Sequence, residues 1–202
     1  MTAFAELWDW RRQVSDLYGD IRAAADPAAA WRQWRDVRDR LFATHPQTPL
    51  DAKRRAAFGG LAYFPYDPSL RFLVGMAPIG DAAIEEFPAG ADGTVRMRPF
   101  ARTDGLLAPL GRELTLYWIT GYGGGVFLPF ADATSGRETF GAGRYLLDTI
   151  KGADLGAAAD GRIVLDFNFS YCPSCAYSPR WVCPLAPPAN RLPAPVRAGE
   201  RN

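Results

Sequence analysis

The apolar residues at the start of the chain recur at the spacing of an α-helix. They follow Thr2 and fall mostly three or four positions apart: Phe4, Leu7, Trp8, Val14, Leu17, Tyr18 and Ile21. This period places them on one face of a helix, with charged residues on the opposite face. The pattern therefore predicts an amphipathic helix over the first twenty or so residues.

A second helix is predicted from the pair Asp26-Pro27. An aspartate before a helix accepts hydrogen bonds from the free N–H groups of the first turn, and proline fits that turn without losing a bond. The helix is expected to end near Thr44, because Pro46 disfavours the α conformation in the residue before it. A third, short helix is expected over 48–54.

After residue 58 the pattern changes to short apolar runs interrupted by glycine, proline, aspartate and asparagine, which is typical of antiparallel strands and their turns. The predicted strands are 61–64, 70–77, 94–100, 113–120, 125–130, 144–147 and 162–170. No helical pattern separates them. The chain is therefore predicted to be α+β, with an N-terminal helical segment (1–57) packed on an antiparallel β-barrel or strongly curved sheet (58–202) that ends in a proline-rich tail, together forming one compact unit.

Composition limits the classes of function. The chain has 202 residues, 48% of them apolar, and a net charge of +1 from 23 basic and 22 acidic residues. This is an ordinary globular composition, and it gives no general electrostatic reason to expect a nucleic-acid or membrane partner. The N-terminus lacks a secretory signal pattern and no apolar run reaches the length of a membrane span, so a cytoplasmic location is expected. The arginines of the second helix are expected to form a solvated face.

Polar residues of the predicted strand 162–170 form one candidate site. If the strand continues to Ser170, Asp166 and Asn168 share one face, because side chains alternate along a strand. Facing outward, they are a solvated surface. Facing a barrel lumen, they place a carboxylate and an amide beside aromatic residues such as Tyr171, which is the composition of a small-molecule pocket. The sequence leaves the direction open.

Arg144 is a second candidate. It starts a predicted strand behind two glycines, which allow another chain segment or a ligand to approach closely. It is expected either to bind an anionic group or to pair with a carboxylate such as Asp132 or Asp166. We favour the pairing, since the guanidinium fork matches a carboxylate. Asp132 itself is expected to open a turn and bond to the following backbone.

The cysteines form a third candidate. Cys172 and Cys175 have the spacing of a redox pair, but the prolines that follow disfavour the helix such a pair needs. Three thiolates with His45, the only histidine, offer four ligands for a structural zinc ion. Alternatively, two of the cysteines are buried apolar side chains or form one disulfide in the tail, which we favour over zinc. His45 stands before a proline at a helix exit, where capping or packing is expected rather than catalysis.

Several motifs follow one another in the second part of the chain. They are 57–68 (AFGGLAYFPYDP), 130–145 (FADATSGRETFGAGRY), 164–168 (VLDFN), 175–177 (CAY), 183–184 (CP), 187–192 (PPANRL) and 198–200 (AGE). Together they resemble an uncharacterised bacterial and archaeal family, the domain-of-unknown-function family sixteen-eighty-four, from about residue 54 to the end. The resemblance implies a shared fold and motif set, and no activity.

The resemblance also bears on the candidate residues. Cys175 and Cys183 match the family pattern, whereas Cys172 stands where the family typically has asparagine. This favours a Cys175–Cys183 pair over a three-cysteine zinc site. The matching polar residues are Asp132, Thr134, Arg144, Asp166, Asn168, Tyr171 and Asn190. They are compatible with a common pocket and equally with a common structural network.

Two hypotheses about function follow. The first is a binding or catalytic site for a small molecule at the barrel mouth. There Asp166 and Asn168 contact the ligand, Arg144 holds an anionic group or orients Asp166, and Tyr171 provides a stacking surface. Asp132 and Asn190 are further candidates for this site. The second is a non-catalytic structural or interaction module, with a buried polar network and a cysteine-stapled or zinc-bound tail. The sequence leaves the reaction class and the oligomeric state open.

Overall fold

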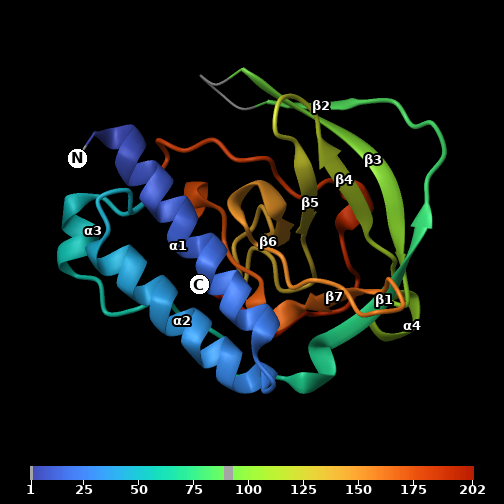
Figure 1. Ribbon diagram of the computed structural model, residues 1–202, viewed down its shortest axis with the longest axis horizontal. Coiled ribbons are helices and arrows are strands. Elements are labelled where there is room, and N and C mark those ends of the chain that lie inside the picture. Colours follow the sequence, from blue (N-terminus) through green and yellow to red (C-terminus); the bar gives the residue numbers. More distant parts are fainter. Residues whose placement is uncertain (1, 89–92) are drawn as a thin grey trace.

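Two long helices lie side by side against a curved sheet in the computed structural model, which describes residues 2–88 and 93–202 (Figure 1). Helix α1 (Ala3–Ala23) begins after Thr2, whose hydroxyl accepts a hydrogen bond from the first turn. Helix α2 (Pro27–Thr44) begins after Asp26, whose carboxylate does the same. Both predicted helices are confirmed, since the caps stand where the sequence signals place them.

The third helix begins later than predicted. Helix α3 (Ala52–Ala56) is capped by Asp51, whose carboxylate accepts from the N–H of Arg54 at 2.7 Å. The expected start at Thr48 is wrong because its hydroxyl donates instead to the carbonyl of Phe42, at 2.8 Å. Thr48 therefore holds the turn that follows α2.

Within residues 2–88 and 93–202, seven strands form one antiparallel sheet. They are β1 (Arg71–Pro78), β2 (Glu85–Pro88), β3 (Thr94–Asp104), β4 (Thr115–Ile119), β5 (Gly125–Phe130), β6 (Arg144–Asp148) and β7 (Ile163–Asp166). Their order is β6-β5-β4-β3-β1-β7, with β2 paired to β3. The outer strands meet because Tyr171, shortly after β7, exchanges backbone hydrogen bonds of 2.9 and 3.1 Å with Tyr145 in β6. The sheet is thus a nearly closed barrel, and the predicted α+β class is confirmed.

Short helical turns lie before, between and after these strands. They are α4 (Leu107–Leu110) and the 3₁₀ turns η1 (Pro68–Leu70), η3 (Thr149–Lys151), η4 (Phe167–Phe169), η5 (Ser174–Ala176) and η6 (Pro188–Asn190). Within residues 2–88 and 93–202, no helix is both long enough and apolar enough to cross a bilayer.

Two predicted strands differ from the structure. Segment 61–64 is an irregular connection with one bridge, from Tyr63 to Glu200. The strand predicted over 162–170 ends at Asp166, because the Asp166 carboxylate accepts from the N–H of Asn168 and caps η4. The expected alternation of a buried and a polar face is therefore wrong beyond β7, where apolar and polar residues alike are buried.

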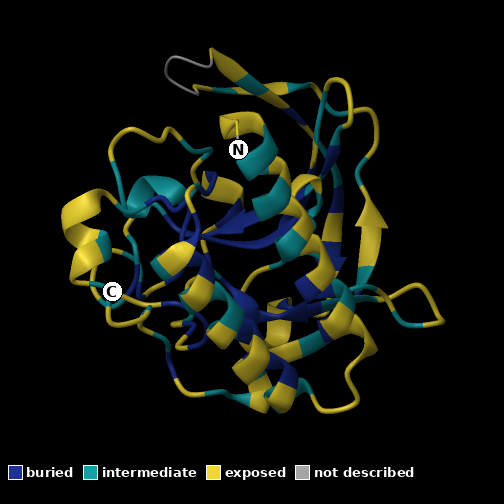
Figure 2. Cartoon of the chain, turned by 60° about the vertical axis from the view of Figure 1, so that its left-hand side comes forward, coloured by how far each residue is buried: buried dark blue, intermediate teal, exposed yellow. Residues whose placement is uncertain are grey.

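The core has a part inside the barrel and a part between the barrel and the helices. The barrel part includes Val74, Leu116 and Phe130. The helix part includes Trp34 and Phe169, whose rings lie 5.4 Å apart. Figure 2 shows the same division, with buried residues along the strands and exposed residues on the outer faces of the helices. The helices therefore cover one side of the barrel.

Candidate functional site

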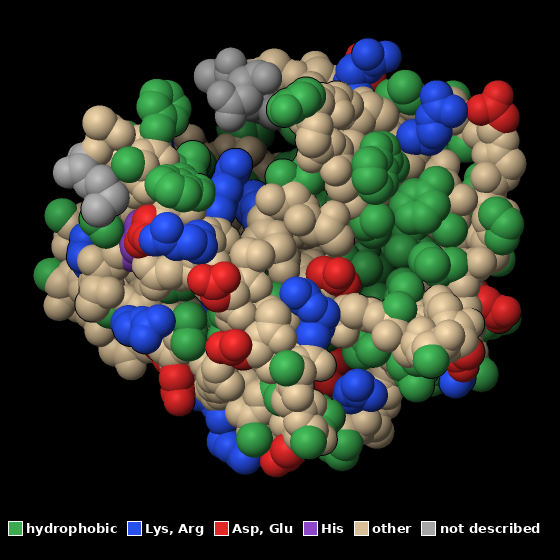
Figure 3. Space-filling view, in the orientation of Figure 1, with side chains coloured by type: hydrophobic (Ala, Val, Ile, Leu, Met, Phe, Trp, Pro, Cys, Tyr) green, Lys and Arg blue, Asp and Glu red, His purple; other side chains and the backbone are tan. Residues whose placement is uncertain are grey.

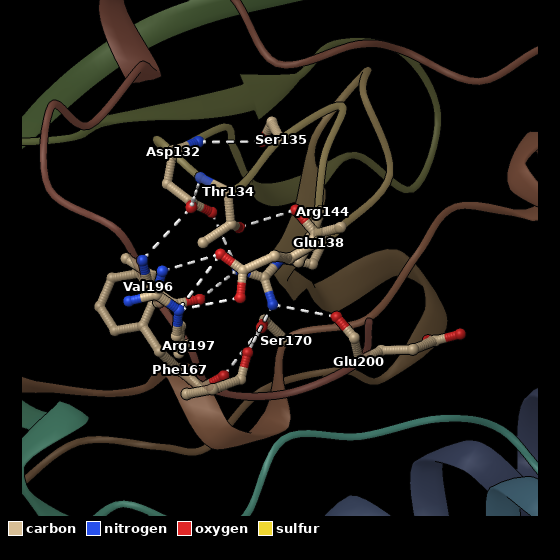
Figure 4. A network of polar contacts seen from close by, with 12 residues as sticks. Asp132, Thr134, Ser135, Glu138, Arg144, Phe167, Ser170, Val196, Arg197 and Glu200 are labelled. Carbon is tan, nitrogen blue, oxygen red and sulfur yellow. Dashed lines mark hydrogen bonds and ion pairs between the residues drawn. The ribbon is translucent and has the colours of Figure 1, made fainter. Parts of the chain in front are cut away.

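Arg144 and Asp132 form a buried ion pair (Figure 4). The guanidinium donates to Oδ2 of Asp132 at 2.9 Å. It also donates to the carbonyl oxygens of Val196 (2.9 Å), Glu200 (3.0 Å) and Ala198. The two side chains are 1% and 0% exposed. Arg144 thus pairs with a carboxylate as favoured from the sequence, and the partner is Asp132 rather than Asp166.

The second oxygen of Asp132 is also engaged. Its Oδ1 accepts from the N–H of Thr134 at 2.7 Å and from that of Val196 at 3.2 Å. The first of these bonds makes the turn predicted after Phe130, and the second holds the C-terminal segment. Because both oxygens have partners within the chain, this ion pair offers a ligand no free acceptor.

Asn168 and Asn190 each bind both backbone groups of one residue, and Nδ2 of Asn190 also donates to the carbonyl of Pro129 at 2.8 Å. Oδ1 of Asn190 accepts from the N–H of Thr115 at 2.7 Å, and its Nδ2 donates to the Thr115 carbonyl at 2.9 Å. Oδ1 of Asn168 and its Nδ2 make the same two contacts with Asp67, both at 2.8 Å. Each side-chain amide thereby makes the two backbone hydrogen bonds that a neighbouring strand would make. These bonds join segments that are distant in sequence.

Asp166 differs from these residues in having one oxygen with little hydrogen bonding. Oδ1 accepts from the backbone N–H and the Nδ2 of Asn168, at 3.0 and 2.7 Å. Oδ2 lies 3.5 Å from the hydroxyl of Tyr66 and 3.6 Å from Nε of Arg71. The side chain is 1% exposed, and this burial raises the pKa of Asp166 against the opposing effect of the Asn168 bonds.

A cavity of about 160 Å³ lies beside this carboxylate. It is lined by Ile21, Arg22, Ala24, Pro27, Ala30, Arg71, Leu155, Ala157, Val164, Asp166 and Phe169. The lining comes from the α1–α2 connection and from β1 and β7. Arg71 is the cross-strand neighbour of Asp166, so the two side chains share one face of the sheet. Asp166 therefore faces the helices, and not the barrel lumen.

The barrel mouth is apolar. Figure 3 shows a hollow of hydrophobic side chains over the region of β3 and β4. Met76 and Trp118, which are 44% and 45% exposed, each stand two positions from a barrel-core residue and so lie on the same face of the sheet. The polar residues predicted for the mouth lie elsewhere in the structure.

A wider depression of about 530 Å³ lies between α2 and α3. Its charged lining residues are Arg55 and Arg180. Arg55 donates to the carbonyl of Ala43 at 2.7 Å, and Arg180 to that of Thr48 at 3.1 Å. These arginines connect α3 and the tail to the end of α2.

Tyr171 packs against a second buried ion pair, Arg38–Glu200, which sequence interpretation missed. The guanidinium of Arg38 lies 5.0 Å from the Tyr171 ring and donates to Glu200 at 2.7 Å. Glu200 also accepts from the N–H of Cys172 at 3.0 Å, and from the hydroxyl of Tyr177. Burial raises the pKa of Glu200, and the Arg38 charge opposes this shift. Arg38 is therefore not part of a solvated helix face.

The three cysteines and His45 lie in different surroundings. Cys172 is buried, and burial raises the pKa of its thiol. Cys175 and Cys183 are free thiols in the tail, and both are half-buried. The His45 ring accepts from the N–H of Gln47 at 3.0 Å and lies edge-on to Trp10. Within the described part of the chain, no three His, Cys, Asp or Glu residues are grouped to hold a metal ion.

The family model described as "Protein of unknown function (DUF1684)" matches residues 56–201. The match covers most of the chain, from the end of α3 through the barrel and tail, so the chain belongs to this family, and the resemblance identified in the sequence is confirmed. No curated protein matches the chain.

A solved structure is also similar. It is the solution NMR structure of an uncharacterized protein from gene locus rrnAC0354 of Haloarcula marismortui, with 32% sequence identity and a TM-score of 0.58. The similarity covers 86% of this chain and 93% of that chain. The fold thus recurs over most of this chain in a protein of similar extent.

Proposed function

We propose that this protein binds a small polar molecule in the cavity between the helices and β7, with Asp166 as its main contact. The observation that carries the proposal is Oδ2 of Asp166, a buried carboxylate oxygen at the wall of a cavity whose hydrogen-bond and ion-pair partners lie 3.5 and 3.6 Å away. A buried carboxylate without full hydrogen bonding is costly, so a ligand that donates to Oδ2 gains the bond that the chain does not provide.

The charges around the cavity favour a ligand that is itself dipolar. Asp166 lies on one side, and Arg22 and Arg71 contribute positive charge to the same lining. The volume of about 160 Å³ is well below the roughly 300 Å³ of the smallest pockets for drug-sized molecules. We therefore infer a ligand with an ammonium or N–H group next to a carboxylate, of the size of a small amino acid.

The substitution Asp166→Asn tests this proposal. It retains an oxygen that can accept from Asn168 and replaces the Oδ2 acceptor by an NH₂ donor. Glycine and alanine are the probes. Methylamine and acetate test the ammonium group and the carboxylate group separately. Two-dimensional NMR titration should show shifts at Arg71 and Asp166 with the amino acids, and at least a tenfold weaker affinity in Asp166→Asn.

Asp160→Asn is the matched control, because Asp160 is an exposed residue shortly before β7 that pairs with Arg162 at 2.8 Å. It should bind the probes like the wild type. Equal affinity in wild type and Asp166→Asn, or no shift with any of these probes, contradicts the proposal.

A second candidate function is a structural or interaction module without a small ligand. It is supported by the hydrogen bonding of Asp132, Arg144 and Asn190, which is directed to other parts of the chain. Under this alternative the as-isolated protein carries no organic molecule in native mass spectrometry, and Asp166→Asn changes only stability. If native mass spectrometry instead shows a small molecule on the wild type and none on Asp166→Asn, the binding site is supported.

A further inference from the structure

The depression between α2 and α3 is formed by segments that are distant in sequence. Helix α3 lies beside the end of α2 (Figure 1), and Arg180 of the tail contributes to the same lining. Its volume of about 530 Å³ falls within the roughly 300–1,000 Å³ of small-molecule pockets. The depression is therefore large enough for a ligand bigger than the one proposed for the Asp166 cavity.

The lining combines an apolar wall with two guanidinium groups. Its apolar residues are Ala43, Pro46, Leu50, Ala52 and Ala56. The Thr48 hydroxyl is already used, since it donates to the carbonyl of Phe42 at 2.8 Å. Of the residues that the structure describes, the lining includes Arg55 and Arg180 and no carboxylate. Its polar groups are therefore mainly donors that carry positive charge.

Arg55 is anchored by one side of its guanidinium group. Its Nε donates to the carbonyl of Ala43 at 2.7 Å, and its Nη2 donates to that of Thr44. These carbonyls belong to the last turn of α2, where they have no partner within the helix. Among the described residues, Nη1 of Arg55 has no acceptor. Arg55 thus covers oxygens that would repel an anion and keeps donors for a ligand.

Arg180 is held in a similar way. Its Nη2 donates to the carbonyl of Thr48 at 3.1 Å, and its guanidinium lies 4.9 Å from the centre of the Trp181 ring. Its Nε and Nη1 meet no acceptor in the part of the chain that the structure describes. The ring and the carbonyl therefore position a guanidinium group whose other donors are available.

No neighbouring carboxylate neutralises these two charges. Asp51 is next to the lining in sequence, but its Oδ1 accepts from the N–H of Arg54 at 2.7 Å and its Oδ2 lies 3.9 Å from Nε of Arg54. Within residues 2–88 and 93–202, neither Arg55 nor Arg180 has a carboxylate at ion-pair distance. An anion in the depression is therefore attracted by both arginines without having to displace a carboxylate.

We propose that this depression binds an organic anion with an apolar body, with a carboxylate as its acidic group. The carboxylate binds Arg55 and Arg180, because the guanidinium fork matches its two oxygens. The apolar body packs on Leu50 and the alanines of the lining, which removes apolar surface from water. The site is separate from the cavity at Asp166, since no described residue lines both.

Octanoate is the probe, followed by two-dimensional NMR. 1-Octanol has the same chain length without the charge, and acetate has the same charge with almost no apolar body. Octanoate should shift the amide signals of Leu50, Ala52 and Ala56 and should bind more tightly than either of the other two. Added salt should weaken its binding, because salt screens the attraction between partly exposed charges.

Arg180→Gln removes one of the two charges, and its side-chain amide can still donate to Thr48. Its affinity for octanoate should be about tenfold lower, as expected when a hydrogen bond to a charged group is lost. Arg112→Gln is the matched control, because Arg112 is also exposed and donates to the carbonyl of Pro188 at 3.1 Å. It should bind octanoate like the wild type, and so should Asp166→Asn.

Three outcomes would overturn the proposal. They are equal affinities of the unmutated protein for octanoate and 1-octanol, equal affinities of the wild type and Arg180→Gln for octanoate, and no octanoate-dependent shift at Leu50, Ala52 or Ala56. The comparison of octanoate with 1-octanol uses the unmutated chain, so it does not depend on how well any variant folds.

Discussion

Two buried carboxylates, Asp132 and Asp166, solve the same physical problem differently. Asp132 uses both oxygens, on Arg144 and on backbone N–H groups of two segments. Asp166 uses Oδ1 on Asn168 and leaves Oδ2 with contacts of 3.5 and 3.6 Å at a cavity wall. Burial alone therefore does not separate a structural carboxylate from a candidate binding group; the hydrogen bonds of each oxygen do. Three substitutions measure this difference.

Breaking the Asp132–Arg144 pair should have the largest effect. Arg144→Met leaves a buried carboxylate without its countercharge, as well as three carbonyl oxygens without their donor. Removing one partner of a buried pair typically costs about 3–5 kcal/mol. Urea unfolding at pH 7 should show this loss, and the double variant Asp132→Asn with Arg144→Met should be less destabilised than the sum of the single changes. If Arg144→Met lowers the free energy of unfolding by less than about 1 kcal/mol, the buried pair does not contribute to stability as expected.

Removing the Asn190 amide should have an intermediate effect. Asn190→Leu leaves the N–H and carbonyl of Thr115 without the partners that lie 2.7 and 2.9 Å away. Buried backbone groups without partners cost about 1–3 kcal/mol. The free energy of unfolding should fall by this amount, and amide exchange at Thr115 should accelerate. Unchanged exchange there would show that another donor or water replaces the amide.

Asp166→Asn should have the smallest effect on stability at neutral pH and a characteristic pH dependence. Burial raises the pKa of Asp166 in the folded chain, so the folded state binds its proton more tightly than the unfolded state. Its contribution is greatest at low pH and is lost as pH rises through the folded pKa. The wild type should therefore lose stability relative to Asp166→Asn as the pH rises above about 4, the ordinary pKa of an aspartate. Parallel pH profiles of the two proteins would contradict the raised pKa.

Local signals in the sequence predicted much of the fold. Asp26-Pro27 located the start of α2, and the apolar runs located β1 and β5. The segment after Asp166 was mispredicted because its alternating apolar and polar residues also suit a capped 3₁₀ turn inside the core. Only the hydrogen bond from Asn168 to Asp166 decides between them.

The candidate site depended on contacts that local patterns do not contain. The sequence favoured a carboxylate partner for Arg144, but Asp132 and Asp166 were equally eligible by residue type. Glu200 was missed as the partner of Arg38 because 162 positions separate them. The signal for such a pair is the lone carboxylate in the motif 198–200 (AGE), one of the motifs that carry the family resemblance, and spacing alone does not assign its partner.

The carbonyl oxygens that receive Arg144 all belong to residues 196–200, and Glu200 also binds Arg38. During synthesis, these acceptors leave the ribosome after both arginines, whereas domains generally begin to fold from the N-terminal side as the chain emerges. Until then, Arg144 in β6 lacks three of its four acceptors, and Arg38 in α2 lacks its carboxylate partner. The native core is therefore completed only once residues 196–200 have left the ribosome, however early α2 and β6 have emerged.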